Sequence, residues 1–309
     1  YSDYLFNQNF SDQLLKDRRQ SLSDEDLVKS NEFWEQNRVE PLQESEKNVY
    51  TMVEELHKVP KFERIVKIVE IVQSGYFNAW NAIDFGSIYA LYGYNEVEGD
   101  RVRVGARTYF SPNDMWRIAG YTAYGFRDRK FKYGVEGKYM FNRENRATIG
   151  FGSKFDVMQL GASLMYDEGI MTPSYGSSGI LTSGSNASLS FVKQNNLFFS
   201  MEPIRNFTVR LDASLQNIIS ANPEKFNLDF YKDNTLKSGL TDFHTTFSLV
   251  LQPGAKYVQY GVDRTTLRTL APTFILKYTH GFANVLEGDF DYNKLQFLYA
   301  QKILLGNLG

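Results

Sequence analysis

The sequence predicts a mainly β fold: part of an antiparallel transmembrane β-barrel, preceded by a short α-helical linker region. Residues 98–141 contain three runs of about a dozen residues that alternate in character at every second position, which is the period of a β-strand. Soluble strands usually extend over about five or six residues, whereas strands of about ten residues with aromatic ends and inward charges are typical of transmembrane barrels. The 24 Phe, 20 Tyr and 23 Gly, with only 8 Pro, suit such a barrel, although they also suit a soluble all-β protein.

The N-terminal residues 1–75 are expected to form a helical region on the periplasmic side. A capping box at residues 23–26 predicts the start of a first helix, which ends near Arg38. Apolar residues at helical spacing predict two more helices, at residues 44–58 and 61–73, and Gly75 ends the last one. We expect this amphipathic block to pack against the rest of the protein. Docking on a neighbouring domain, plugging a pore mouth and lying on the membrane remain alternatives.

Residues 76–309 are expected to hold the strands of the barrel. Counting from Ile83 gives about nine to eleven candidate strands, and Gly- and Ser-rich residues 167–187 predict a long loop. The chain begins without a signal peptide and does not finish on a strand with a terminal aromatic residue, so we expect it to be truncated at both ends. The strands predicted most clearly are residues 83–94, the three runs of 98–141, 146–157, 206–218, 242–252, 273–280 and 290–303.

Charged residues share one face of these predicted strands. In the first run Val102 and Val104 fall on one face, while Arg101 and Arg103 fall on the other. If the strands close into a barrel, this charged face lines the lumen, and an uncompensated basic ring would favour anionic solutes. The alternative, which we favour, is that carboxylates pair with the Arg and Lys side chains and brace the wall. The lumen-facing candidates are Arg101, Arg103, Arg107, Arg117, Lys132, Glu136, Lys138, Arg210 and Asp212.

Other chemistry finds little support in the sequence. No cysteine is present, which excludes disulfides, thiolate catalysis and Cys-ligated zinc. His57, His244 and His280 are far apart and lack metal-ligand spacing, so no metal and no cofactor are expected. Asp289 and Asp291 form a small acidic cluster that could bind calcium weakly, although a solvated loop is the favoured interpretation. The net charge of −2 implies no general attraction to nucleic acid.

Several short motifs lie in the helical region and the first predicted strands. They are Phe33-Trp34-Glu35, Asn37-Arg38, Pro41-Leu42, residues 59–62, 94–99, 101–108, 124–128 and 131–133. Together they resemble a large family of Bacteroidota outer-membrane proteins, over residues 20–145 most closely. The resemblance implies a signal peptide, a carboxypeptidase-regulatory-like β-sandwich, a helical linker and a C-terminal barrel of unknown function. The regulatory-like module is not catalytic, so the resemblance implies no peptidase.

From these observations we expect an outer-membrane β-barrel protein that acts in transport across, or assembly of, the outer membrane and is not an enzyme. Its expected partners are outer-membrane lipid and, as further candidates, other outer-membrane or periplasmic proteins. Two alternatives remain: a barrel enzyme that acts on lipid or glycan, and a soluble all-β binding protein. The sequence contains no Ser-His-Asp or paired-carboxylate motif that favours the enzyme.

Overall fold

The computed structural model describes residues 58–80, 82–111, 113–160, 189–267 and 270–303, with single positions between 33 and 56. The chain divides into two units, Tyr1–Ser74 and Gly75–Gly309, and each is described by itself. The predicted loop at residues 167–187 lies outside the described residues, as do most of the two helices predicted before residue 58.

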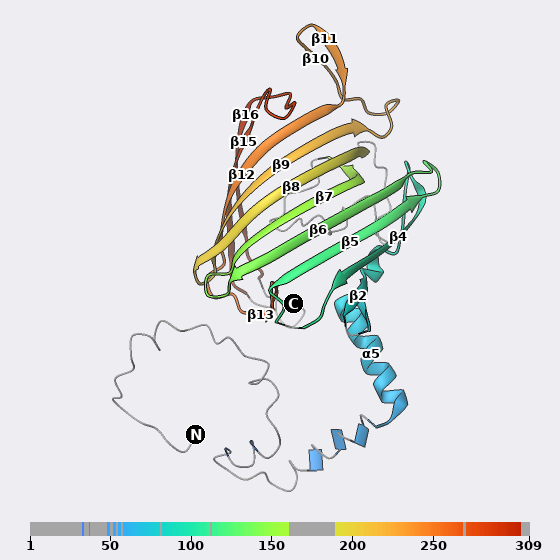
Figure 1. Ribbon diagram of the computed structural model, residues 1–309, viewed down its shortest axis with the longest axis vertical. Helices are drawn as coiled ribbons and strands as arrows, with labels where there is room; N and C mark the ends of the chain where they lie inside the picture. Colours follow the sequence, from blue (N-terminus) through green and yellow to red (C-terminus); the bar gives the residue numbers. More distant parts are fainter. Residues whose placement is uncertain are drawn as a thin grey trace, which may run out of the picture. The chain divides into compact units, whose positions relative to one another are not determined.

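In the first unit the structure describes one helix, α5 (Pro60–Ser74), which confirms the helix predicted at residues 61–73 (Figure 1). Pro60 suits the first helical turn because its missing N–H has no partner there in any helix. Glu63 and Lys67 form an i,i+4 pair at 3.8 Å. Gly75, with φ of +75°, follows the last helical residue in the left-handed conformation that glycine adopts without strain. No helix in the described part of the chain is long and apolar enough to cross a membrane.

The second unit is mainly β and is built on a twelve-stranded antiparallel sheet. Nine of the strands are long, from nine to sixteen residues. They are β4 (Gly99–Thr108), β5 (Trp116–Gly125), β6 (Phe131–Asn142), β7 (Ala147–Gln159), β8 (Leu189–Ile204), β9 (Phe207–Ser220), β12 (Leu240–Leu251), β15 (Thr273–Gly281) and β16 (Tyr292–Ala300).

Short elements complete the unit. Three short strands, β1 (Tyr76–Ala79), β2 (Ile83–Gly86) and β3 (Tyr92–Asn95), form the N-terminal edge of the sheet, with the 3-10 turn η1 (Ile88–Ala90) between β2 and β3. Two small hairpins are inserted between long strands. They are β10 (Asp229–Lys232) with β11 (Thr235–Ser238), and β13 (Tyr257–Tyr260) with β14 (Asp263–Thr266).

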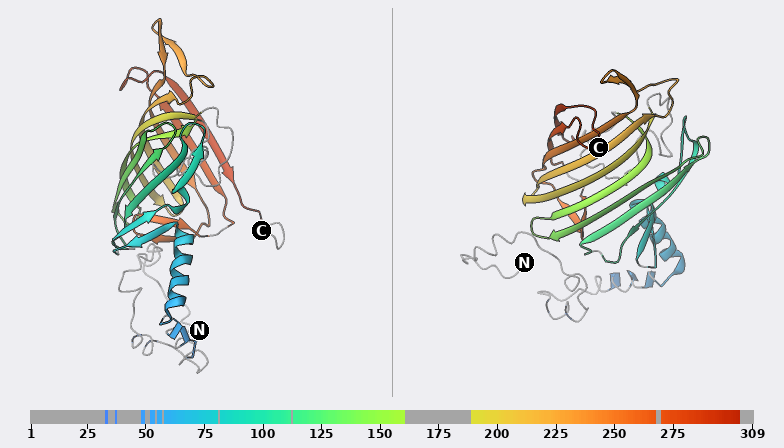
Figure 2. Two further views of the ribbon diagram at one scale, coloured as in Figure 1. Left: turned by 90° about the vertical axis from the view of Figure 1, so that its right-hand side faces the viewer. Right: turned by 45° about the horizontal axis from the view of Figure 1, so that its top comes forward.

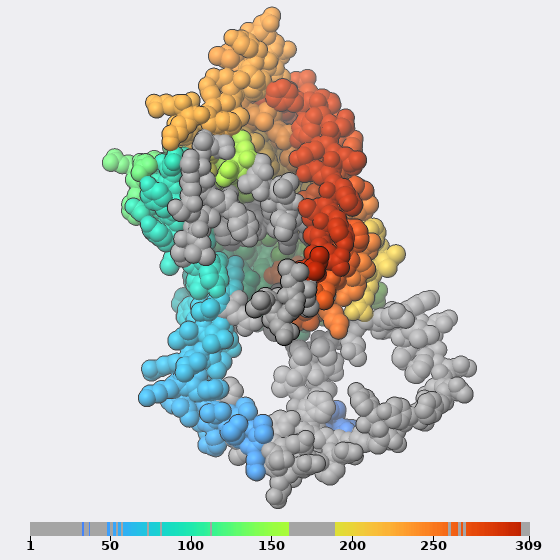
Figure 3. All heavy atoms as spheres, turned by 180° about the vertical axis from the view of Figure 1, so that it is seen from behind, coloured from blue at the N-terminus to red at the C-terminus, as the bar shows by residue number. Residues whose placement is uncertain are grey.

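The long strands follow one another in an up-and-down order, so that neighbours in sequence are neighbours in the sheet. The sheet is strongly curved, and strands from its two halves face each other in the side view (Figure 2). An ion pair at 2.7 Å joins Lys225, after β9, to Glu96, after β3, which brings these two connections together. Among the described residues β16 pairs only with β15, so its other edge is open. Figure 3 shows β16 in red on one side of the rear face and the first strands in cyan on the other.

The prediction of one continuous strand at residues 83–94 is wrong, because these residues form β2, η1 and β3 in the structure. β2 pairs with one half of β4, at Thr108 to Ala106, and β3 pairs with the other half, at Val102 to Gly99. The chain between them must therefore pass along β4, and it does so where Gly105 leaves room. A Cβ atom at Gly105 would lie 2.4 Å from the carbonyl oxygen of Gly86.

The other predicted strands are found with shifted ends. The last predicted strand, residues 290–303, is shorter in the structure and spans Tyr292–Ala300. The prediction missed β8, the longest strand, whose centre carries Gln194, Asn195 and Asn196 in succession. Polar residues on both faces conceal the alternation that marks a half-buried strand.

Candidate functional site

The faces of the main sheet have the inverse of the side-chain distribution found in a water-soluble protein. Here the inner face is the one that carries Arg101, Arg103, Arg117 and Lys132, and the outer face is the opposite one. Arg101 is 1% exposed and Lys132 is 0% exposed, whereas Val104 is 53% exposed and Phe131 is 71% exposed. Charged residues are almost never fully buried unless they are paired. The inner face must therefore also carry carboxylates that pair with these cations, and the structure contains them.

A first group of buried charges lies on β4 to β7 and is called here the first charge cluster: Glu98, Arg101, Asp128, Lys132 and Asp156. Arg101 pairs with Glu98 at 2.9 Å and with Asp156 at 2.6 Å. Lys132 pairs with Glu98 at 2.7 Å and with Asp128 at 2.6 Å. Three carboxylates thus face two cations, and Glu98 joins both cations into one network. The cluster connects the turn before β4, the turn before β6 and the third strand along, β7.

Aromatic and polar side chains complete the first charge cluster. Tyr121 donates a hydrogen bond of 2.6 Å to Asp156, and the guanidinium of Arg103 lies 3.7 Å above the Tyr121 ring. Asn95 donates a hydrogen bond of 2.6 Å to Glu98. A ring face attracts a guanidinium electrostatically, so Arg103 is stabilised by Tyr121. A buried network of this kind, with each carboxylate and each cation paired, rigidifies the part of the sheet that holds it.

A second group, called here the second charge cluster, comprises Arg117, Lys138, Glu136 and Asp263. Arg117 on β5 and Lys138 on β6 are direct cross-strand partners. Asp263, at the start of β14, lies between them, 2.8 Å from Arg117 and 2.5 Å from Lys138. Glu136 lies 3.8 Å from Lys138 on the same strand. Burial would raise the pKa of Asp263, but the charges of Lys138 and Arg117 outweigh it and hold that pKa below its usual range.

The β13–β14 hairpin that carries Asp263 has further attachments to the main sheet and its turns. The Val262 amide donates to the Asp114 carbonyl at 2.7 Å, and Arg146 donates to the Val262 carbonyl at 2.8 Å. Arg264 pairs with Glu202 on β8. Residues inserted after β12 therefore reach the inner face of strands that come much earlier in the chain.

The remaining lumen-facing candidates form two further ion pairs, in which Asp84 is buried and the other three side chains are partly exposed. Arg107 pairs with Asp84 on β2 at 2.9 Å. Arg210 pairs with Asp212 on its own strand at 2.7 Å, and its guanidinium lies 3.9 Å above the Phe198 ring. The nine candidate residues thus do not form one basic ring. The structure distributes them over two clusters and two further ion pairs, each of which contains at least one carboxylate.

Sequence reasoning missed the carboxylates that pair with these cations: Asp84, Glu98, Asp128, Asp156 and Asp263. Asp156 had a usable signal, because it lies between Phe155 and Val157 in a predicted strand and so points to the inner face. Asp263 had none, since nothing in the sequence predicts that a short hairpin after β12 reaches β5 and β6. Glu98 and Asp128 occur in predicted turns, where acidic residues are common.

The histidines and the loop acids hold ordinary structural contacts. His244 bonds through Nδ1 to Asp242 at 2.8 Å, and His280 bonds through Nδ1 to Asn293 at 2.9 Å; His57 lies outside the described residues. No group of three or more His, Asp or Glu side chains in the described ranges is arranged to hold a metal ion.

Asp289 is buried, whereas Glu287 and Asp291 are exposed, so the favoured interpretation of a solvated loop is wrong for Asp289 alone. Its carboxylate accepts from Lys237 at 2.7 Å, from the Thr241 amide at 2.7 Å and from Lys232 at 3.0 Å. Burial would raise the pKa of Asp289, but these hydrogen bonds lower it below its usual range. Both lysines bond Oδ1 and the Thr241 amide bonds Oδ2, so both oxygens that a calcium ion would need already have partners.

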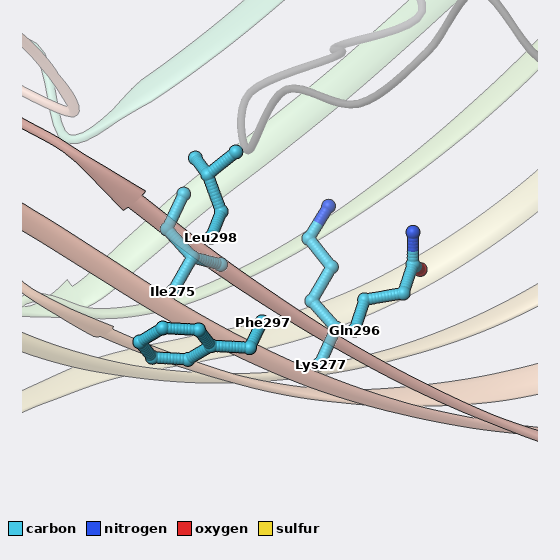
Figure 4. Close-up of a pocket in the computed structure, with 5 residues that line it drawn as sticks. All are labelled: Ile275, Lys277, Gln296, Phe297 and Leu298. Carbon is cyan, nitrogen blue, oxygen red and sulfur yellow. The ribbon is translucent and has the colours of Figure 1, made fainter.

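A small hollow lies between β15 and β16, lined by Ile275, Lys277, Gln296, Phe297 and Leu298. Lys277 and Gln296 extend side by side from the same side of the two strands (Figure 4). Its volume of about 50 Å³ is far below the roughly 300–1,000 Å³ of small-molecule sites. The hollow is therefore too small to be the functional site.

The comparisons with known proteins give one match. Residues 187–309 match the model of the C-terminal domain of a family of unknown function, DUF5686. Neither the comparison with curated proteins nor the comparison with solved structures gave a match. The matched residues include β8, β9, β12, β15 and β16 and both hairpins. They are distinct from residues 20–145, in which the short motifs of the N-terminal half lie.

Proposed function

We propose that residues 75–309 provide strands of an outer-membrane β-barrel, and that the protein acts in transport across, or assembly of, the outer membrane. The observation that supports this most is the inverse distribution of side chains on the main sheet. Val104 and Phe131 are exposed on the outer face, while Arg101 and Lys132 are buried on the inner face. Water makes such an arrangement unfavourable, whereas hydrocarbon outside and a polar interior make it favourable.

The dimensions of the strands support the same proposal. A tilted strand needs about 9–11 residues to cross a membrane, and the nine long strands have from nine to sixteen. A spanning structure must also satisfy its backbone hydrogen bonds internally. Every interior strand of the main sheet has a hydrogen-bonded neighbour on each side. The open edge of β16 would need a further partner, from the protein itself or from another chain, for the wall to be complete.

In this proposal the inner face of the main sheet carries out the function. For transport, it supplies a polar surface on which positive and negative side chains pair with each other. Solutes of either charge could then pass without binding strongly to the surface. For assembly, the incomplete wall and the periplasmic region would handle client outer-membrane proteins. The partners are outer-membrane lipid and other outer-membrane or periplasmic proteins. The motifs similar to Bacteroidota outer-membrane proteins support this location.

Membrane partitioning tests the proposal. The protein expressed with a signal peptide should fractionate with the outer membrane, require detergent for extraction and migrate differently on gels before and after heating. Recovery as a soluble monomer without detergent would contradict the membrane proposal and favour a soluble all-β binding protein.

Reconstitution in planar bilayers then separates the two activities. Stepwise, ion-selective conductance would support transport, whereas a silent barrel that co-purifies with newly made outer-membrane proteins would support assembly. Release of fatty acid or of reducing sugar from outer-membrane lipid or glycan would instead support an enzyme. An active-site variant is not needed for this test, because heat-inactivated protein in the same detergent serves as the control.

A further inference from the structure

We propose that Arg117 and Lys138 form a binding site for a phosphate group, and that Asp263 of the β13–β14 hairpin occupies this site in the present structure. The proposal concerns the second charge cluster alone and does not depend on the proposed function. It makes Asp263 an internal competitor for an external anion.

The first argument is the placement of two cations opposite each other. Arg117 and Lys138 are direct partners in the antiparallel pairing of β5 with β6. Side chains at such positions have Cβ atoms about 4.5–5.5 Å apart, and like charges placed there are destabilising. The pair therefore requires an anion between the two side chains. Asp263 provides it, with one oxygen 2.8 Å from Arg117 and the other 2.5 Å from Lys138.

The second argument is that Asp263 leaves donors of Arg117 unused. The Arg117 side chain is 3% exposed, and its Nε and Nη2 atoms have no hydrogen-bond partner among the described residues. A buried donor without a partner is unfavourable, because it has lost its hydrogen bonds to water and gained none in the protein. The ring of Tyr109 lies 5.1 Å from the guanidinium, but it offers no lone pair to these nitrogens. A carboxylate that also binds Lys138 has too few oxygens to accept hydrogen bonds from all the N–H groups of the Arg117 guanidinium.

A phosphate group fits these unused donors better than the carboxylate does. It carries more acceptor oxygens and more charge than a carboxylate, and a guanidinium binds it through two parallel hydrogen bonds. Lys138 and Asp263 are about one quarter exposed, so an anion can reach the pair from the Lys138 side. Glu136, 3.8 Å from Lys138, opposes the bound anion and limits its affinity.

Binding at this site has a consequence for the hairpin. A phosphate that takes the two cations displaces the carboxylate of Asp263 and removes one of the attachments of β13–β14. The Val262 amide, Arg146 and Arg264 hold the rest of the hairpin. Because one of the four attachments is lost, the hairpin should open locally more often while phosphate is bound, and this is measurable as faster cleavage at Arg264.

The test measures binding of inorganic phosphate to the purified full chain by isothermal titration calorimetry at constant ionic strength. We expect Asp263→Asn to bind phosphate roughly tenfold more tightly than the wild type, because the competing charge is gone. Adding Arg117→Gln to this variant should abolish the gain. Asp212→Asn is the matched control: it removes an inner-face carboxylate that pairs with Arg210 elsewhere, and should leave phosphate affinity unchanged.

A second readout keeps the test decisive if Asp263→Asn fails to fold. Saturating phosphate should increase trypsin cleavage of the wild type at Arg264, and chloride at the same ionic strength should not. Micelles containing phosphatidylglycerol, compared with inorganic phosphate, distinguish a lipid headgroup from a free anion as the source. Equal phosphate affinity of Asp263→Asn and Asp212→Asn, or cleavage at Arg264 that phosphate does not change, would overturn the proposal.

Discussion

Replacement of Asp156 by Asn tests whether the first charge cluster stabilises the sheet. The side chain of Asp156 is 6% exposed, and its carboxylate accepts from Arg101 at 2.6 and 2.9 Å and from Tyr121 at 2.6 Å. Asn keeps the shape but has one acceptor oxygen and no charge. Loss of one partner from a buried ion pair costs about 3–5 kcal/mol. Glu98 still neutralises Arg101, so we expect a loss near the lower limit, about 3 kcal/mol.

The measurement is urea unfolding in detergent micelles, followed by tryptophan fluorescence, with the midpoint and slope compared between variants. Asp212→Asn is again the control, because the side chains of Arg210 and Asp212 are 26% and 20% exposed and such a pair contributes about 0–1 kcal/mol. If Asp156→Asn loses no more stability than this control, the buried network does not stabilise the sheet, and the argument from burial and bond geometry is wrong.

Three further predictions concern other parts of the sheet. Val104→Arg should destabilise the protein in lipid by about 2–4 kcal/mol if the outer face meets hydrocarbon, and by no more than about 0.5 kcal/mol if it meets water; folding titrations into vesicles measure this. Gly105→Ala should cost about 1–3 kcal/mol in urea unfolding, because its Cβ would lie 2.4 Å from the Gly86 carbonyl oxygen; no loss would contradict that close approach. Asp263 has a lowered folded-state pKa, so its stabilising contribution is complete above the ordinary Asp pKa of about 3.9 and is lost as the pH falls through the lower folded value. Acid titration of Asp263→Asn should therefore show a smaller loss of stability than that of the wild type, and identical curves would contradict the assignment.

Alternation predicted the faces of the long strands but not the contacts between them. That Arg101 and Lys132 point away from Val102 and Phe131 follows from the period of two, which holds whatever the neighbouring strands are. That Arg101 pairs with Asp156, 55 residues later, depends on the order and register of four strands. A local sequence pattern encodes neither the order nor the register of the strands. The sequence therefore predicted a charged face without predicting which carboxylates neutralise its cations.

Local patterns also failed where the chain leaves the simple up-and-down order. Residues 83–94 alternate well enough to predict one strand, yet pairing of β2 and β3 with separate halves of β4 breaks them. The short hairpins were missed for a related reason: four-residue strands such as β13 and β14 are too short to show a period. Asp263 lies in one of these hairpins, so it is the one member of the second charge cluster that the sequence did not predict.

The first charge cluster also bears on how the strands find their alignment during folding. Slippage of one strand by a single residue would turn all of its side chains to the opposite face. For β4, such a slip would move Arg101 to the outer face and leave Glu98 and Asp156 without it. The Arg101–Asp156 pair can form only when β4 and β7 are both aligned with the strands between them. A misaligned arrangement would leave these charges without partners in a buried environment, so the cluster favours the native alignment over its one-residue neighbours.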